Sequence, residues 1–248
     1  MKTPKSTGSA TDFIPARPTL AKLRAAVQDC RGCALYANAT QAVFGEGSSR
    51  ATLLIVGEQP GDAEDRAGRP FVGPAGKLLD RSLEAAGIDR EDTYVTNAVK
   101  HFKWARDARS ARRLHKTPSR GEVRACFPWL AHEIAIVKPR VVLCLGATAA
   151  KSLLGPSFSV MKKRGQPIET EFAEVAFATV HPSAILRAPR EERTRAERMF
   201  VADLRRVAKH LASEKRPERP ANRFSAWLPH AIAGRSTTSN GSTRSSRG

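Results

Sequence analysis

One histidine lies inside a strongly basic stretch of the chain. The segment ARRLHKTPSR, residues 111–120, contains His115, and residues 100–124 hold nine Lys or Arg against two acidic residues. Lys and Arg in this pattern bind the phosphates of a polyanion. A neutral imidazole is also a good nucleophile near pH 7. The residues alone leave two interpretations of His115 open: a solvated member of a phosphate-binding loop, or a group that reacts with the bound polymer.

The four cysteines form a second set of residues that could do chemistry. Cys30 and Cys33 make a C-x2-C pair, whereas Cys126 and Cys144 stand alone further along the chain. Four thiolates are a ligand set for zinc or for an iron–sulfur cluster. Free cysteine is also a common small core residue, and Cys144 lies in the apolar stretch VVLCL. Both interpretations of Cys144 stay open at this point.

The composition indicates a nucleic-acid partner. The 248 residues carry 42 Lys or Arg and 24 Asp or Glu, a net charge of +18, of which residues 213–248 contribute only +5 (seven basic, two acidic). No apolar run approaches the roughly 18 residues of a membrane span, and no signal peptide is evident. We therefore expect a bacterial protein that is cytoplasmic, nucleoid-associated, monomeric and without membrane contact. The glycine-rich GPAGKLL is not a nucleotide phosphate loop, because Leu78 stands where that motif needs Ser or Thr.

The elements that must position these residues alternate between strands and helices. Apolar runs predict strands, and periods of 3.6 residues predict helices. The expected strands are residues 51–57, 93–99, 140–145 and 175–180, and the expected helices are residues 19–29, 76–86, 121–137, 147–154 and 190–211. Residues 1–18 are expected to be a flexible leader, residues 19–212 a single domain, and residues 213–248 a disordered basic tail.

This order predicts an α/β fold with three layers, α/β/α, around a central, mostly parallel, four-stranded sheet. Ligands of such sheets bind beyond the carboxyl ends of the strands. The unusual segments lie at those ends: GEQPGD, TNAVKHFKW, LGATAA and HPS follow the first to fourth strands, respectively. Because these four segments converge at the carboxyl ends of the strands, they predict a ligand-binding site there.

Three of these segments resemble a known family. GEQPGDAEDRAGRPFVGPAG, TNAVKHFKW and HPSAILR are similar to the motifs of the uracil-DNA glycosylase superfamily, in its iron–sulfur branch, and RRLHK makes the chain most similar to the UdgX group. The resemblance covers roughly residues 21–211. It implies a glycosylase that excises uracil from DNA, preferably single-stranded DNA. It also implies a [4Fe-4S] cluster held by Cys30, Cys33, Cys126 and Cys144.

The resemblance implies roles for the residues that read the base. Asn97 would accept from uracil N3–H and donate to O4, a pattern that cytosine reverses. Phe71 would stack on the base, and His181 would donate to O2 as negative charge develops on the leaving uracil. The backbone of the GEQPG turn would face the base at Gly57, Gln59 and Gly61. Taken alone, these residues could instead cap a turn (Asn97, His181) or fill the core (Phe71).

The resemblance also implies the chemistry at the sugar. His115 would attack C1′ and remain attached to the abasic DNA, with Glu58 orienting the ring and balancing its charge; alternatively, Glu58 would position a water. The DNA backbone would be held by Arg112, Arg113, Lys116, Ser183 and Arg187. The main expectation is a single-turnover enzyme. A hydrolytic glycosylase with turnover and a non-catalytic iron–sulfur module that binds DNA are the alternatives.

Overall fold

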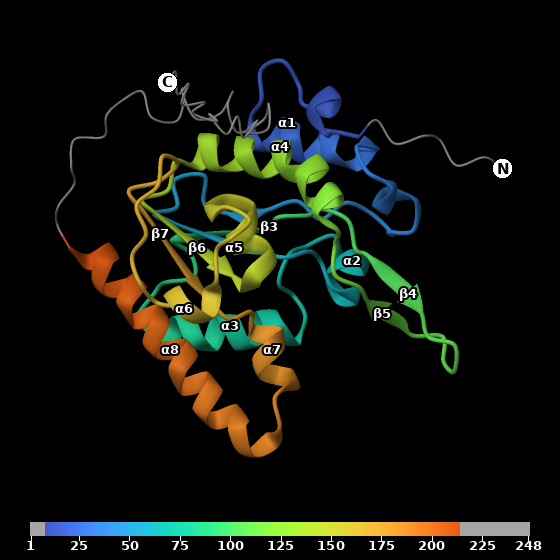
Figure 1. Ribbon diagram of the computed structural model, residues 1–248. Helices are drawn as coiled ribbons and strands as arrows, with labels where there is room; N and C mark the ends of the chain where they lie inside the picture. Colours follow the sequence, from blue (N-terminus) through green and yellow to red (C-terminus); the bar gives the residue numbers. More distant parts are fainter. Residues whose placement is uncertain (1–7, 214–248) are drawn as a thin grey trace, which may run out of the picture.

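The structure, a computed structural model, describes residues 8–213. Its centre is a sheet with the strand order β1-β3-β2-β6-β7 (Figure 1). Four strands run parallel: β2 (Leu53–Gly57), β3 (Thr93–Asn97), β6 (Val141–Leu145) and β7 (Val175–Thr179). These are the four predicted strands. A fifth, two-residue strand that was not predicted, β1 (Glu46–Gly47), pairs antiparallel with β3 at the edge.

Helices cover both faces of the sheet, which confirms the predicted three-layer architecture. Every residue of the four parallel strands is buried, because both faces are covered. One face packs against α4 (Arg120–Val137), α5 (Gly146–Leu154) and the short α6 (Val160–Lys163). The other face packs against α3 (Pro74–Ala85), α7 (Pro182–Arg187) and α8 (Arg190–Ala212), as Figure 1 shows.

The boundaries of α4 follow from its capping residues. Ser119 accepts the Glu122 N–H (3.2 Å), and the Glu122 carboxylate accepts the Ser119 N–H (2.6 Å), which forms a capping box. The helix ends at Lys138, whose φ of 50° lies in the left-handed region. These caps fix the helix that carries Cys126 and Glu133 against the sheet.

The N-terminal arm is packed against the domain, which corrects the prediction of a flexible leader. Ala10 is fully buried, and its N–H donates to the Ala125 carbonyl of α4 (2.7 Å). A Cβ on Gly32 would come within 2.7 Å of the backbone of Ser9 and Ala10. The short helices of this arm are η1 (Thr11–Phe13), α1 (Leu20–Ala26), η2 (Val27–Asp29) and η3 (Ala34–Ala37). The domain therefore includes residues 8–18, while residues 1–7 and 214–248 lie outside the described part.

Several short elements are absent from the prediction, among them α6 and α7. The Gly/Pro-rich segment after β2 contains α2 (Asp62–Ala67). The basic segment is a hairpin of β4 (Trp104–Arg106) and β5 (Arg113–His115), which projects from the side of the sheet (Figure 1). Of the helices within residues 8–213, none has both the length and the apolar character needed to cross a membrane.

Candidate active site

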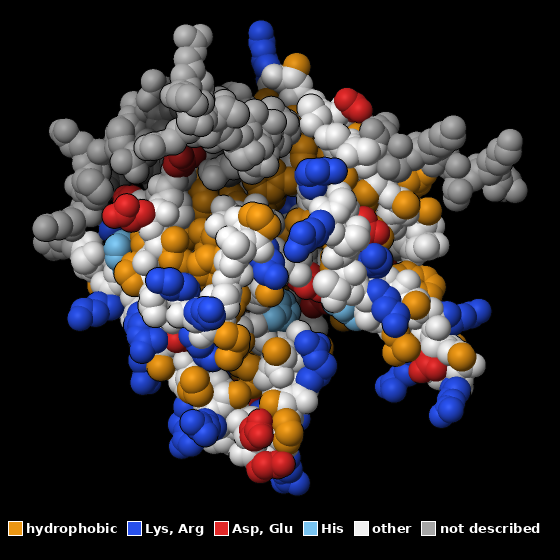
Figure 2. Space-filling view, in the orientation of Figure 1, with side chains coloured by type: hydrophobic (Ala, Val, Ile, Leu, Met, Phe, Trp, Pro, Cys, Tyr) orange, Lys and Arg blue, Asp and Glu red, His pale blue; other side chains and the backbone are white. Residues whose placement is uncertain are grey.

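A cavity of about 610 Å³ opens at the carboxyl ends of the parallel strands, where the sequence predicted a site. Its wall includes Glu58 and Gln59 after β2, Gly146 after β6 and His181 after β7, and His115 joins them from the hairpin. Figure 2 shows histidine side chains in a hollow of this face, with Lys and Arg side chains gathered around it. The volume suits a group of nucleoside size.

His115 and Glu58 meet in this cavity. The Nε2 atom of His115 lies 3.5 Å from Oε1 of Glu58, and the His115 side chain keeps 46% of its surface exposed. Burial lowers the pKa of His115 below its ordinary value, and this outweighs the opposing effect of the Glu58 carboxylate. The ring is therefore neutral at pH 7. The Thr148 hydroxyl of α5 donates to the other oxygen of Glu58 and orients the carboxylate.

Thr148 is a site residue that the sequence reasoning missed. Its segment, LGATAA, was noted as unusual at a strand end, but no residue in it was assigned a role. A threonine in that position is ordinary helix composition, and only the approach of α5 to the turn after β2 reveals its partner.

The second histidine has a defined protonation state. His181 caps α7, and its Nδ1 atom accepts the backbone N–H of Ser183 (3.2 Å) and lies 2.9 Å from the Ser183 hydroxyl. Burial, with smaller contributions from Arg187 and His115, lowers the pKa of His181 to about 4. The ring is therefore neutral at pH 7. Because Nδ1 accepts, the proton lies on Nε2, which makes Nε2 a hydrogen-bond donor.

The residues expected to read a base lie behind His181. Phe71 stacks on the His181 ring with the centroids 6.1 Å apart. Asn97 and Phe71 are buried and meet at Gly57, where an added Cβ would collide with the Asn97 side-chain oxygen and come within 2.7 Å of Phe71. Phe71 has a φ of 56°, a strained value for a residue with a side chain. The structure thus places Gly57, Phe71 and Asn97 together, although none of them lines the open cavity.

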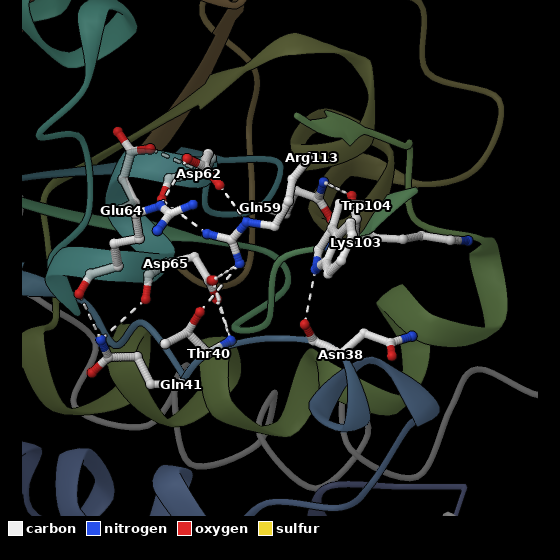
Figure 3. Close-up of polar contacts among 12 residues, drawn as sticks. Asn38, Thr40, Gln41, Gln59, Asp62, Glu64, Asp65, Lys103, Trp104 and Arg113 are labelled. Atoms are coloured by element: carbon white, nitrogen blue, oxygen red, sulfur yellow. Dashed lines mark hydrogen bonds and ion pairs between the residues drawn. The ribbon is translucent and has the colours of Figure 1, made fainter. Parts of the chain in front are cut away.

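The side chain of Gln59 makes contacts that the sequence did not predict. Its side-chain amide donates to the carbonyls of Lys103 (3.2 Å) and Lys116 (3.1 Å) and accepts the Lys103 N–H (3.1 Å). These contacts join the turn after β2 to the base of the β4–β5 hairpin, at the residue before β4 and the residue after β5; Figure 3 shows Gln59 beside Lys103. The side chain therefore holds the hairpin. Gly61 is likewise occupied, because its N–H donates to the Glu64 carboxylate (3.1 Å).

Arg113 is held within the protein, which contradicts the prediction that it binds a DNA phosphate. Its guanidinium pairs with Asp62 and with Asp65 (2.6 Å), and it donates to Thr40 (3.1 Å). It lies 5.4 Å from the ring of Phe102. Only 11% of the side chain is exposed. Figure 3 shows the guanidinium directed from β5 toward α2. Arg113 thus fixes the strand that carries His115.

The remaining predicted phosphate ligands lie on the hairpin and on α7. Arg112 and Lys116 are exposed on the hairpin, and Arg187 is exposed on α7 and lines the cavity. Ser183 also lines the cavity, with its hydroxyl directed to His181. Exposed cations on these elements suit an extended polyanion.

The four cysteines do not lie together. Cys30, Cys33 and Cys126 share one buried cluster, in which the Lys100 N–H donates to the Cys126 sulfur (3.2 Å) and the Trp129 ring N–H donates to the Cys30 sulfur (3.2 Å). Burial raises the pKa of both Cys33 and Cys126.

Cys144 lies instead in β6, in the core cluster between the sheet and α4. A cluster held by all four cysteines therefore does not fit, whereas Cys30, Cys33 and Cys126 lie in one cluster. We remove Cys144 from the ligand set, since it behaves as the small core residue that the alternative interpretation described.

The fold and the site define an α/β protein with a cavity at the strand ends. Two neutral histidines, a carboxylate and the cation Arg187 line this cavity. The sequence profile of the Uracil DNA glycosylase superfamily matches residues 44–205, and the chain belongs to that family.

The relatives agree with this assignment. The chain is 37% identical over 189 residues to the Type-4 uracil-DNA glycosylase of Thermotoga maritima, covering 76% of this chain and 92% of that protein. It is 39% identical over 177 residues to the Type-4 uracil-DNA glycosylase of Pyrobaculum aerophilum, covering 68% of this chain and 86% of that protein. Among solved structures, SMUG2 of Pedobacter heparinus is similar with a TM-score of 0.44 and 14% identity, over 65% of this chain and 76% of that one.

Proposed function

We propose that the protein excises uracil from DNA and remains covalently joined to the abasic site through His115. The observation that carries this proposal is the pairing of His115 with Glu58 on one wall of the cavity whose other wall holds His181. The superfamily match and the Type-4 relatives support uracil in DNA as the substrate. The RRLHK segment, which resembles UdgX proteins, supports the covalent outcome.

The proposed reaction balances with these three side chains. The bond from C1′ to uracil N1 breaks, and its electron pair leaves with uracil, which becomes an anion. The Nε2–H of His181 donates to uracil O2 and stabilises that charge. The lone pair of the His115 imidazole then forms a bond to C1′, which makes the ring cationic. The Glu58 carboxylate first balances this positive charge. It then accepts the proton that remains on the ring, which leaves both groups neutral.

Base recognition is proposed to use Phe71 and Asn97, the buried residues that meet at Gly57. A base entering beside His181 would contact Phe71 with its face and Asn97 with its edge. Asn97 can match the donor at uracil N3 and the acceptor at O4, whereas cytosine would leave buried polar groups unpaired, at a cost of about 1–3 kcal/mol each. Gly57 keeps the space at which these two side chains meet.

The proposal is tested by incubating the protein with an oligonucleotide that contains a single uracil. We expect free uracil together with a protein–DNA band that survives a denaturing gel, and neither product from the thymine oligonucleotide. Free uracil in excess of protein, without the band, would support the hydrolytic alternative, in which Glu58, held by Thr148, positions a water. Binding without free uracil would support a non-catalytic module.

The rate of covalent complex formation should fall as pH decreases, with a midpoint below pH 6.5. The neutral His115 ring is the nucleophile, and burial lowers its pKa below the ordinary value of about 6.5, so protonation stops the reaction only below that value. His181, with a pKa of about 4, stays neutral at pH 6.5. Single-turnover rates on single-stranded uracil DNA measure the profile. A midpoint at or above pH 6.5 would contradict the burial argument.

We also propose that Cys30, Cys33 and Cys126 hold a [4Fe-4S] cluster, as the resemblance to the iron–sulfur branch implies, with a fourth ligand other than Cys144. Such a cluster would tie the N-terminal arm to α4, and no step of the reaction runs through it. Their shared buried cluster and the two N–H donors to their sulfurs support this.

Iron content should separate the two kinds of cysteine. Cys126→Ala is expected to lose iron and acid-labile sulfide, because it removes a thiolate ligand. Cys144→Ala is expected to keep both, because it removes a core side chain from β6. The measurement is iron and sulfide per folded chain after anaerobic purification, with folding checked by circular dichroism. Loss of iron from a folded Cys144→Ala protein would restore Cys144 to the ligand set.

A further inference from the structure

An exposed methionine stands at the mouth of the cavity. Met161 has 73% of its surface exposed, and it lines the cavity together with His181 and Arg187. The other large hydrophobic side chains that are exposed within residues 8–213, Leu114 at 42% and Met199 at 44%, do not line it. Single exposed apolar side chains are ordinary on protein surfaces, so it is the position of Met161 in the cavity lining, beside His181 and Arg187, that sets it apart.

The segment that carries Met161 is anchored. The preceding residue, Val160, is the first residue of α6 and is buried in the core. After the helix, Arg164 pairs with Asp203 of α8 (2.7 Å), and the Gly165 N–H donates to the Ala178 carbonyl of β7 (2.9 Å). Met161 therefore projects from a fixed turn, and its exposure follows from the position of its neighbours.

The charges beside Met161 suit a nucleic-acid backbone. Lys162 and Lys163 follow directly and are exposed, and Arg187 lies on the wall formed by α7. A strand whose base occupies the cavity would thus meet cations from α6 and from α7, with the methionine between them.

We propose that Met161 is a wedge that fills the gap left in a DNA base stack when the target nucleotide enters the cavity; this rests on the proposed function. An enzyme that acts on a base in a duplex must rotate that base out and pay for the lost stacking. Proteins that distort DNA commonly insert an apolar side chain between bases, methionine included. The long, unbranched methionine side chain adapts to an irregular gap.

The neighbouring apolar residues are unsuited to this role. On α7, Ile185 is buried in the core and Leu186 packs against it, while the exposed Ala184 is too short to enter a base stack. Leu114 is exposed on the hairpin but faces away from the cavity lining. Met161 is thus the side chain of the described cavity wall that combines reach, exposure and apolar character.

The test compares one uracil oligonucleotide as a single strand and annealed to its complement with adenine opposite the uracil. Single-turnover release of uracil is measured for wild type, Met161→Ala, Met161→Leu, Leu114→Ala and the matched control Met199→Ala. Met161→Ala is expected to lose on the order of tenfold more rate on the duplex than on the single strand, because only the duplex must be unstacked. Met161→Leu should recover most of that loss, and Met199→Ala should match wild type on both substrates.

A second readout separates the wedge from a general loss of binding. With 2-aminopurine beside the uracil of the duplex, fluorescence rises as the stack opens, and Met161→Ala should lower that rise. Equal losses on both substrates, a duplex-specific loss in Leu114→Ala in place of Met161→Ala, or a wild type inactive on the duplex would each overturn the wedge. Failure of the wild type to release uracil from either substrate would instead defeat the proposed function.

Discussion

Replacing His115 by serine is expected to abolish the covalent protein–DNA complex, from about one complex per chain to none, while uracil release persists. The variant removes the nitrogen that lies 3.5 Å from Glu58 at the cavity wall and leaves space into which water can enter. His181, Asn97 and Phe71 remain, so departure of uracil is still stabilised. Water then attacks the sugar cation at C1′. Because no bond to the protein forms, the enzyme can release the DNA and turn over.

The measurement is a denaturing gel for the complex, with a parallel assay of free uracil over several protein equivalents of substrate. Arg109→Gln is the matched control, because Arg109 is exposed on the same hairpin outside the cavity lining. It should keep the complex. An undiminished complex in His115→Ser would disprove the assignment of the nucleophile.

The second large effect is expected in the core, where Lys100 and Glu133 form a fully buried ion pair at 2.5 Å. Glu133 also accepts hydrogen bonds from the Gly45 N–H, the Tyr94 hydroxyl and the Thr96 hydroxyl, each at 3.0 Å. Removing one partner leaves the other charge buried without compensation. Lys100→Met or Glu133→Gln should therefore lower the free energy of unfolding by about 3–5 kcal/mol.

The same pair supports the candidate site. The Lys100 ammonium donates to the Asn97 carbonyl (2.8 Å), and the Lys100 N–H donates to the Cys126 sulfur (3.2 Å). Lys100→Met should thus also reduce discrimination between uracil and cytosine, since Asn97 loses a contact that fixes it. Lys100 thus contacts Asn97 through its side chain and Cys126 through its backbone N–H.

Urea unfolding monitored by circular dichroism measures the stability change. Asp80→Asn, which breaks the exposed pair with Arg90, is the control and should have a far smaller effect. The double variant Lys100→Met, Glu133→Gln should cost less than the sum of the two single changes, because it leaves no unpaired charge. Strictly additive losses would show that the two charges do not depend on each other.

The positions of the strands and the convergence of their ends followed from the sequence. Buried parallel strands need continuous apolar residues, so the runs LLIV, VVLCL and VAFAT predict strands. The polar segments that follow these strands must then meet at one edge of the sheet. Glu58 and His181 are therefore found together. His115 was anticipated through a motif, and its approach to Glu58 depends on a hairpin that the basic composition did not reveal.

The partners of individual polar side chains were not predictable in this way. Arg113 reads as one more phosphate ligand in RRLHK, yet it is neutralised by Asp62 and Asp65. Gln59 was expected to present its backbone to the base, and the contacts of its side chain with the hairpin were not foreseen. Cys144 reads as a fourth ligand, yet its strand places it in another core cluster.

The amino-acid sequence by itself determined the parallel sheet, its helical layers, the basic character of the binding face and the residue types gathered at the strand ends. Apolar periodicity and chain order are local properties, and they suffice for those features. Only the tertiary structure decided which cation pairs within the protein and which faces the solvent, which thiols share a cluster, and which histidine nitrogen bears the proton. Those outcomes depend on distances of a few ångströms between segments far apart in the chain, which no local pattern encodes.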